Sequence, residues 1–193
     1  MVDINKTREQ PIEQFWDMTE DIRAGMLGVE GSGQHMQPMH PNCEREGRNI
    51  WFFVKKDSDL ARAIGAGSHG HFCVIGRGHD YHACVSGQLT LEPNKAMIER
   101  FWDSATAAWF NGKDDPNMTL VKMALDDGVA WASVGSVKFG WEILKANMSE
   151  KDPEVGARKH FSFVHQVDNG HHRPMGGGQP DASRLVPRQE GQI

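Results

Sequence analysis

The chain has 193 residues, of which 38% are hydrophobic and 24% are charged, and its formal net charge is −5. This length accommodates one well-buried domain with extensions rather than two full domains. No apolar run approaches the length of a membrane span, and no cluster among the 21 basic residues marks a nucleic-acid partner. The polar N-terminal stretch MVDINKTREQPIEQF lacks the apolar core of a secretory signal, so we expect a cytoplasmic protein with its three cysteines reduced.

The first periodic segment predicts a helix that begins near Pro11 and ends by Gly25. Its apolar stripe should cover a core and consists of Ile12, Phe15, Trp16, Thr19 and Ile22.

Short segments punctuated by glycine follow, each about the length of a strand: MLGVEGSG, HMQPMHPNC, NIWFFV, GHFCVIGRG and HACVSGQLTL. They predict an antiparallel sheet. The segment NIWFFV does not alternate between apolar and polar residues but is apolar on both faces. This indicates a strand buried on both sides, between a barrel interior and a covering helix or second subunit.

The C-terminal half predicts a helix over residues 94–110, the strands TLVKMALDD and GVAWASV, and a last helix over residues 137–148. The composition then changes to Gly, Pro, His, Arg and Gln. We therefore expect a barrel-like domain over residues 1–151 and an extended arm over residues 152–193 that adds little to the core. Within the arm, HFSFVHQV alternates well enough to dock as a short strand.

The junction WFFVKKDSDLARAI passes from a strand into a helix at Ser58. A helix N-terminus offers free N–H groups to a phosphate, but capping serines are far commoner than ligand sites, so capping is the favoured interpretation.

Two further patterns are weighed in the same way. The segment GAGSHG, residues 65–70, matches a dinucleotide fingerprint but follows a helix and precedes a strand, the reverse of what that site requires. Four histidines, His69, His71, His79 and His82, lie near one another in sequence, yet they lack the tight spacing of a metal site.

Several blocks, in this order, resemble the general stress protein 26 group of the pyridoxamine 5′-phosphate oxidase-like, FMN-binding split-barrel family. They are EQFWDMTEDIRAGML, QPM, WFFVKKDSDLARAI, HACVSGQL, RFWDSATAAWFNGKDDPNMTLVKM and VAWASVG. The resemblance covers residues 10–148. It implies a mainly β (α+β) fold, a six-stranded antiparallel split β-barrel with flanking helices, and a homodimer with two flavin sites at the subunit interface.

The resemblance also implies where the flavin phosphate would bind. Gln37, ahead of Pro38 and Met39, stands where the family has an arginine, and Leu60 stands where a lysine usually follows the Ser58 region. Asp59 would repel a phosphate there. Each lost charged contact costs about 1.5 to 3 kcal/mol, so we expect weakened phosphate binding unless Arg62 or the lysine pair 55–56 compensates.

For the isoalloxazine ring, the resemblance implies main-chain contacts from Phe53 and Val54, with His82 facing the ring or ribityl chain. Trp131 would reach in from the partner subunit or else pack in the core.

The expected function is FMN binding, with an oxidoreductase activity and a role in general stress as its extension. FAD, a deazaflavin or haem in the same cleft are alternatives. A different alternative is a dimer that has lost FMN and serves as a binding module. Neither the small-molecule substrate nor a catalytic residue can be read from the sequence.

Overall fold

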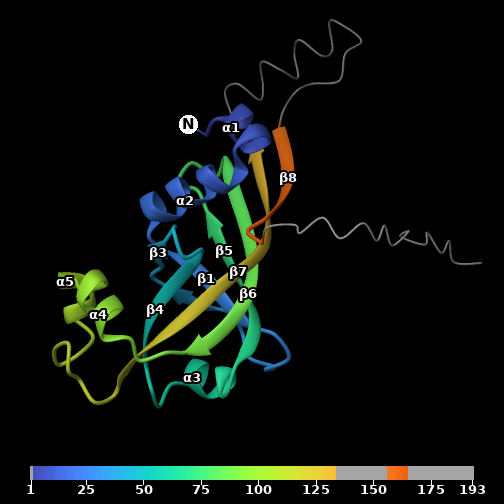
Figure 1. The fold of residues 1–193 in the computed structure, drawn as a ribbon. Helices are drawn as coiled ribbons and strands as arrows, with labels where there is room; N and C mark the ends of the chain where they lie inside the picture. The colour runs from blue at the N-terminus through green and yellow to red at the C-terminus, as the bar shows by residue number, and fades with distance from the viewer. Residues whose placement is uncertain (1, 134–155, 165–193) are drawn as a thin grey trace, which may run out of the picture.

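The computed structural model describes residues 2–133 and 156–164, and its centre is one antiparallel sheet of eight strands (Figure 1). The strands are β1 (Gly25–Val29), β2 (Gln37–Met39), β3 (Asn42–Glu44), β4 (Asn49–Lys55), β5 (Ser68–Ile75), β6 (Tyr81–Leu91), β7 (Met118–Ser133) and β8 (Gly156–Ser162). Their order in the sheet is β2-β1-β5-β6-β7-β4-β3, and β8 also pairs with β7. The predicted antiparallel split barrel with flanking helices is confirmed as a sheet curled into a half-barrel, with eight strands where six were expected.

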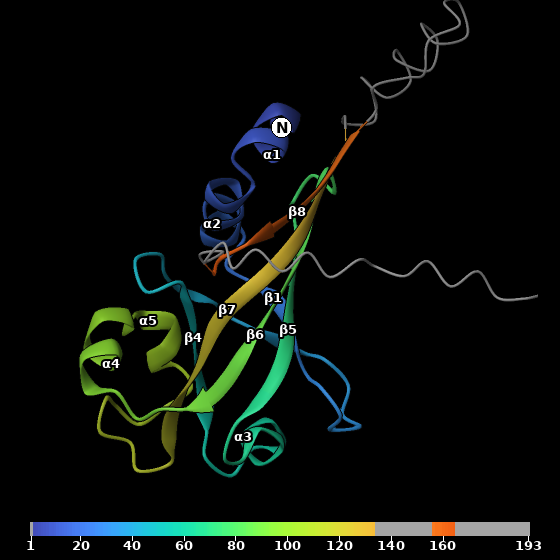
Figure 2. The same ribbon diagram turned by 45° about the vertical axis from the view of Figure 1, so that its right-hand side comes forward.

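Strand β7 changes its partner halfway along, and this gives the sheet its curl. On one side it pairs with β6 through residues 121–132. On the other side its first half, residues 118–124, pairs with β4, and its second half, residues 127–133, pairs with β8. Strands β4 and β8 diverge from each other along β7, and the sheet is curled into a half-barrel (Figure 2).

The sequence predicted two strands where β7 is continuous. The Asp-Asp-Gly step at which the two predicted strands meet is a bulge, since no β6 residue lies opposite Asp126 between the pairs Gly87–Leu125 and Ser86–Asp127. Gly87 is required here, because a Cβ at this position would lie 2.2 Å from the carbonyl oxygen of Ala124. The bulge bends the strand without ending it.

Helices flank the sheet at three places (Figures 1 and 2). Those described are α1 (Ile4–Glu9), α2 (Pro11–Ile22), α3 (Asp59–Ile64), α4 (Lys95–Phe101) and α5 (Ser104–Ala107). The first two cover the end of the sheet next to β8, α3 closes the opposite end, and α4 and α5 stand beside β4. The predicted stripe of α2 is confirmed, with Phe15, Trp16 and Thr19 buried. The helix expected over 94–110 is two short helices, because the chain is extended at Trp102.

Strand β4 lies between two hydrophobic clusters, which confirms that it is buried on both faces. Ile50, Phe52 and Val54 point into the large cluster inside the half-barrel. Trp51 points the other way, into a smaller cluster with Ile98 of α4. The covering element is therefore a helix of the same chain.

The tail contributes more to the core than we expected. Strand β8 begins four residues before HFSFVHQV, and Phe161 and Phe163 are buried in the large cluster at 8% and 3% exposure. The expectation of little core after Lys151 is wrong for these two residues, since both rings pack against Phe15 of α2 and Phe163 also packs against Trp16. The helix predicted over 137–148 lies outside the described residues. No helix in the described part of the chain is long and apolar enough to cross a membrane.

Candidate functional site: a cavity beside strand β4

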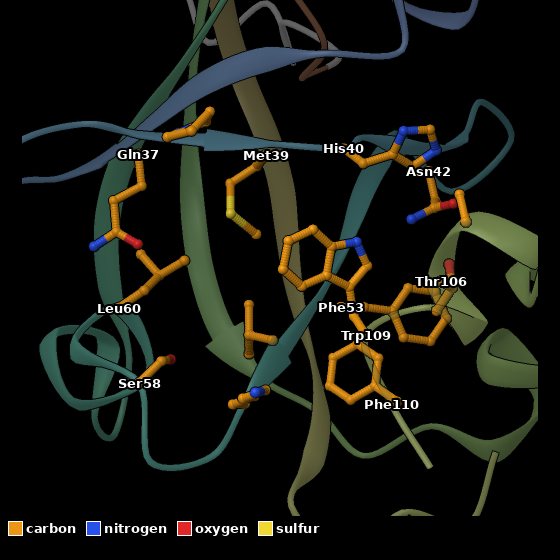
Figure 3. A pocket seen from close by; sticks show the side chains of 14 residues that line it. Gln37, Met39, His40, Asn42, Phe53, Ser58, Leu60, Thr106, Trp109 and Phe110 are labelled. Atoms are coloured by element: carbon orange, nitrogen blue, oxygen red, sulfur yellow. The ribbon is translucent and has the colours of Figure 1, made fainter. Parts of the chain in front are cut away.

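A cavity of about 660 Å³ lies between β2, β4, the start of α3 and the α5 region (Figure 3). Fourteen residues line it: Gln37, Pro38, Met39, His40 and Asn42 around β2; Phe53, Val54, Lys55, Ser58 and Leu60 from β4 to α3; and Ala105, Thr106, Trp109 and Phe110. Small-molecule sites typically measure about 300 to 1,000 Å³ and are mainly apolar. This cavity meets both conditions.

One wall of the cavity is aromatic. The rings of Phe53 and Phe110 lie 6.2 Å apart, and Trp109 projects beside them with 75% of its surface exposed (Figure 3). Exposure of so large an apolar side chain beside a cavity is typical of a ligand contact rather than of core packing.

Two aspartates hold the segments next to this wall, one as a helix cap and one within a loop. The Asp103 carboxylate accepts a hydrogen bond from the Thr106 N–H at 2.8 Å and thereby starts α5, while Arg23 pairs with its other oxygen at 3.0 Å. The hydrogen bond from Thr106 keeps the pKa of Asp103 below its usual value. Asp115 accepts bonds at 2.8 Å from the N–H groups of Asn111 and Asn117, which lower its pKa too and shape the loop after Phe110.

The sheet edge at the cavity leaves main chain available to a ligand. Strand β3 pairs with β4 only at residues 49–51, so Phe53 and Val54 have a strand partner on the β7 side alone within the described sheet. Strand β2 is likewise the end of the sheet, and among the described strands it pairs only with β1. Backbone N–H and C=O groups at such edges can recognise the polar rim of a flat ring.

The corner expected to hold a phosphate is poor in available cations. Gln37 and Leu60 project into it from β2 and α3, near Ser58 (Figure 3). Arg62 does not line the cavity, because its guanidinium pairs with Asp59 and donates to the Asp57 carbonyl oxygen. The Lys56 ammonium donates to the Pro116 carbonyl oxygen at 2.6 Å. Among the residues that line the cavity, Lys55 is the one lysine or arginine that could attract a phosphate.

Ser58 caps α3, as the sequence predicted. Its hydroxyl oxygen accepts a hydrogen bond from the Ala61 N–H at 3.1 Å. The hydroxyl still borders the cavity, so capping and ligand contact are compatible.

His82 and Trp131 lie outside this cavity. They are cross-strand neighbours on β6 and β7 and border a separate shallow hollow beside β8, where the Arg158 guanidinium lies 5.8 Å from the Trp131 ring centre. Within one chain the structure therefore brings seven of the ten predicted cofactor residues together and leaves out Arg62, His82 and Trp131.

The sequence did not single out Trp109 and Phe110 of the aromatic wall, nor His40, Asn42 and Thr106. The signal was present in AWFNGKDDPN, a segment that keeps two bulky aromatic residues next to a loop. Aromatic residues on the apolar face of a helix are explained by core packing alone. Trp109 and Phe110 instead follow the last turn of α5, so core packing in a helix does not account for them.

The histidine and glycine patterns have structural roles in the described residues. In the described residues no group of His, Cys, Asp or Glu side chains could hold a metal ion. His69 pairs instead with Glu30 at 3.1 Å and with Asp126 at 2.9 Å. Gly65 ends α3 with a positive φ of 52°, which agrees with a helix stop rather than a dinucleotide loop.

A curled antiparallel sheet with an open cavity beside β4 defines this molecule as a split-barrel protein. The family model described as "Pyridoxamine 5'-phosphate oxidase like" matches residues 10–154, and the chain belongs to that family.

Three relatives refine this placement. General stress protein 26 of Bacillus subtilis (strain 168) is 25% identical over 125 residues, which are 62% of this chain and 87% of that protein. The crystal structure of a general stress protein 26 from Jannaschia sp. CCS1 has 30% identity and a TM-score of 0.68, covering 81% of this chain and 99% of that one. The general stress FMN/FAD binding protein from Xanthomonas citri has 35% identity and a TM-score of 0.60, covering 64% and 89%. The resemblance to the general stress protein 26 group is thus confirmed.

Proposed function

We propose that this chain is a flavin-binding protein and that the cavity beside β4 holds the isoalloxazine ring. The observation that carries the proposal is the cavity itself, about 660 Å³ in volume, apolar on one side and bordered by open strand edges on the other. The Xanthomonas citri relative, which is described as an FMN/FAD binding protein, supports the same ligand class.

The residues present fit the ring better than the phosphate. Phe53, Trp109 and Phe110 offer apolar surface to the ring faces, and the main chain of β4 offers hydrogen bonds to its rim. At the phosphate corner, Gln37 and Leu60 carry no charge, and Asp59 holds Arg62. We therefore propose that the ring supplies most of the affinity, so that FMN, FAD, a deazaflavin and unphosphorylated riboflavin differ little.

A bound flavin would supply the hydride or electron transfer of an oxidoreductase, the reaction class that we propose for this fold. The chain's own contribution would be to orient the ring and shield it from water. Among the lining residues, His40 offers an imidazole and Lys55 an ammonium group; the His40 Nδ1 lies 2.8 Å from the Arg23 carbonyl oxygen, which orients its ring.

We also propose a homodimer in which the Trp131 face of one protomer completes the cavity of its partner. Ile75, His82 and Trp131 stand side by side on β5, β6 and β7, and Ile75 and Trp131 are 52% and 39% exposed. A row of exposed apolar side chains on one sheet face supports an interface there.

Two measurements test the proposal. The absorbance spectrum of freshly purified protein should show flavin, whereas a haem spectrum would identify a different cofactor. Titration of flavin with protein should then quench its fluorescence, and Trp109→Ala should weaken binding by several-fold to about tenfold, the worth of one aromatic contact. Val164→Ala is the control, since Val164 is also exposed but lies on the tail beside β8. Unchanged emission at saturating protein would leave the alternative, a barrel that has lost its cofactor.

Light scattering tests the dimer. Wild-type protein should have twice the mass of the chain, and Ile75→Glu should halve it while Val164→Glu should not. A wild-type monomer would contradict the proposed role of Trp131.

A further inference from the structure

Cys73 and Cys84 lie directly opposite each other on β5 and β6, with their sulfur atoms 3.0 Å apart. Both side chains are half-buried on the outer face of the sheet, between Met26 of β1 and Val129 of β7. A disulfide needs a sulfur–sulfur distance of about 2.05 Å, so closure requires an approach of only about 1 Å between two residues that the sheet already holds in register.

The surroundings of the pair favour reaction at Cys73. The hydrogen bond between the two thiols lowers the pKa of Cys73 to about 7, because it stabilises the thiolate more than partial burial opposes it. The pKa of Cys84 is raised, first by the same hydrogen bond and then by burial, so Cys84 keeps its proton while Cys73 reacts. The third thiol is different, since burial raises the pKa of Cys43 to about 12.

We propose that Cys73 and Cys84 form a peroxide-reactive dithiol, a modification site outside the cavity beside β4 and two residues along β5 and β6 from Ile75 and His82. The Cys73 thiolate attacks one oxygen of hydrogen peroxide, the O–O bond breaks, and hydroxide leaves, which gives a sulfenic acid. The Cys84 sulfur then attacks this sulfur, and the hydroxyl group leaves as water with the Cys84 proton. In sum, two thiols lose two electrons to one peroxide, one disulfide forms, and two molecules of water result. A dithiol reductant reverses the reaction.

Alkylation after peroxide treatment tests the site. Reduced full-length protein is treated with hydrogen peroxide, the peroxide is removed, and free thiols are alkylated before intact-mass analysis and peptide mapping. We expect the oxidised protein to be lighter than the reduced protein by two hydrogens, apart from one alkyl group on Cys43. The peptide map should show a disulfide between the peptides that contain Cys73 and Cys84. The free thiols of Cys73 and Cys84 should disappear at least about tenfold faster than the thiol of Cys43, because the Cys73 thiolate is available near neutral pH.

Single variants separate the two roles. Cys84→Ser should stop at a Cys73 sulfenic acid that a 1,3-diketone traps, Cys73→Ser should react at least about tenfold more slowly, and Cys43→Ser should still form the link. Circular dichroism of each variant checks that the sheet is retained, with Cys→Ala versions as replacements for any that unfold. The proposal is overturned if wild-type protein keeps all three thiols, if the link joins two chains, or if it involves Cys43.

Discussion

Asp59 and Arg62 form an ion pair within the first turn of α3, and the same guanidinium donates to the carbonyl oxygen of Asp57. Both groups are more than 60% exposed, so the pair adds little to stability. Its consequence is for binding. A carboxylate at the start of the helix both repels an anion and occupies the cation that could have attracted one.

Asp59→Asn should therefore strengthen FMN binding. The change removes one negative charge and releases Arg62 toward the phosphate corner, and we expect the dissociation constant of FMN to fall about three- to tenfold. Riboflavin, which has no phosphate, should bind as before. Fluorescence titration of both ligands measures this, and an equal gain for both would show that the effect is on the ring and not on the phosphate.

Gln37→Arg should have a larger effect in the same direction, because Gln37 already lines the cavity. A new charged hydrogen bond to phosphate contributes about 1.5 to 3 kcal/mol, or roughly a tenfold to hundredfold tighter FMN complex. The matched control is Gln88→Arg, which adds the same charge at an exposed position of β6 away from the cavity. Leu60→Lys is a poorer choice, since Leu60 is only 3% exposed and packs in the core. If Gln37→Arg and its control behave alike, the phosphate is not near β2.

Tyr81→Phe should stabilise the fold. Tyr81 is fully buried, its hydroxyl has no hydrogen-bond partner among the described residues, and burial raises its pKa. An unsatisfied buried hydroxyl costs about 1 to 3 kcal/mol, so removing it should raise the free energy of unfolding by about 1 kcal/mol. Denaturant titration monitored by tryptophan fluorescence gives this value. A clear loss of stability would mean that the hydroxyl has a partner, such as a buried water molecule.

Phe163→Ala should destabilise the domain by about 3 to 5 kcal/mol, the usual cost of deleting a buried aromatic ring. The Phe163 ring lies 5.8 Å from Phe15 and 5.7 Å from Trp16, and its N–H donates to the Asp126 carbonyl oxygen at 2.9 Å. Val164→Ala, at the neighbouring position with 56% exposure, should change stability by less than about 0.5 kcal/mol. Equal effects of the two variants would show that the residues directly after β8 are not part of the core.

His69 should make stability depend on pH. Hydrogen bonds to Asp126 and then Glu30 raise its pKa in the folded protein above the unfolded value of about 6.5. A raised folded pKa means that the folded state holds the proton more tightly, so the contribution is complete below about pH 6.5 and is lost as pH rises through the folded pKa. The pKa of Glu30 is lowered by His69, so its carboxylate stays charged through this range.

The check is the melting temperature of wild type and His69→Gln between about pH 5.5 and 9. The difference should be greatest at the acid end and shrink toward the alkaline end, whereas His35→Gln, at an exposed loop position, should show no such trend. A difference that is constant with pH would mean that His69 acts through packing alone.

Local patterns in the sequence determined much of this protein. The stripe of α2, the double burial of β4 and the cap at Ser58 follow from spacing and side-chain type, since each depends on residues close together in the chain. Seven of the residues that the resemblance to the general stress protein 26 group implied for the cofactor also line the cavity.

The tertiary structure decided the rest. The strand continues through Asp126-Asp127-Gly128 because of a bulge opposite Gly87. Phe163 is buried because it meets Phe15 of α2. Cys73 meets Cys84 because of the register of β5 with β6. The same holds for Arg62, whose charge the sequence shows but whose partner it does not. These outcomes are set by contacts between residues far apart in the chain, or by a choice among competing partners, and a linear pattern carries no information on which of them the folded chain brings within reach.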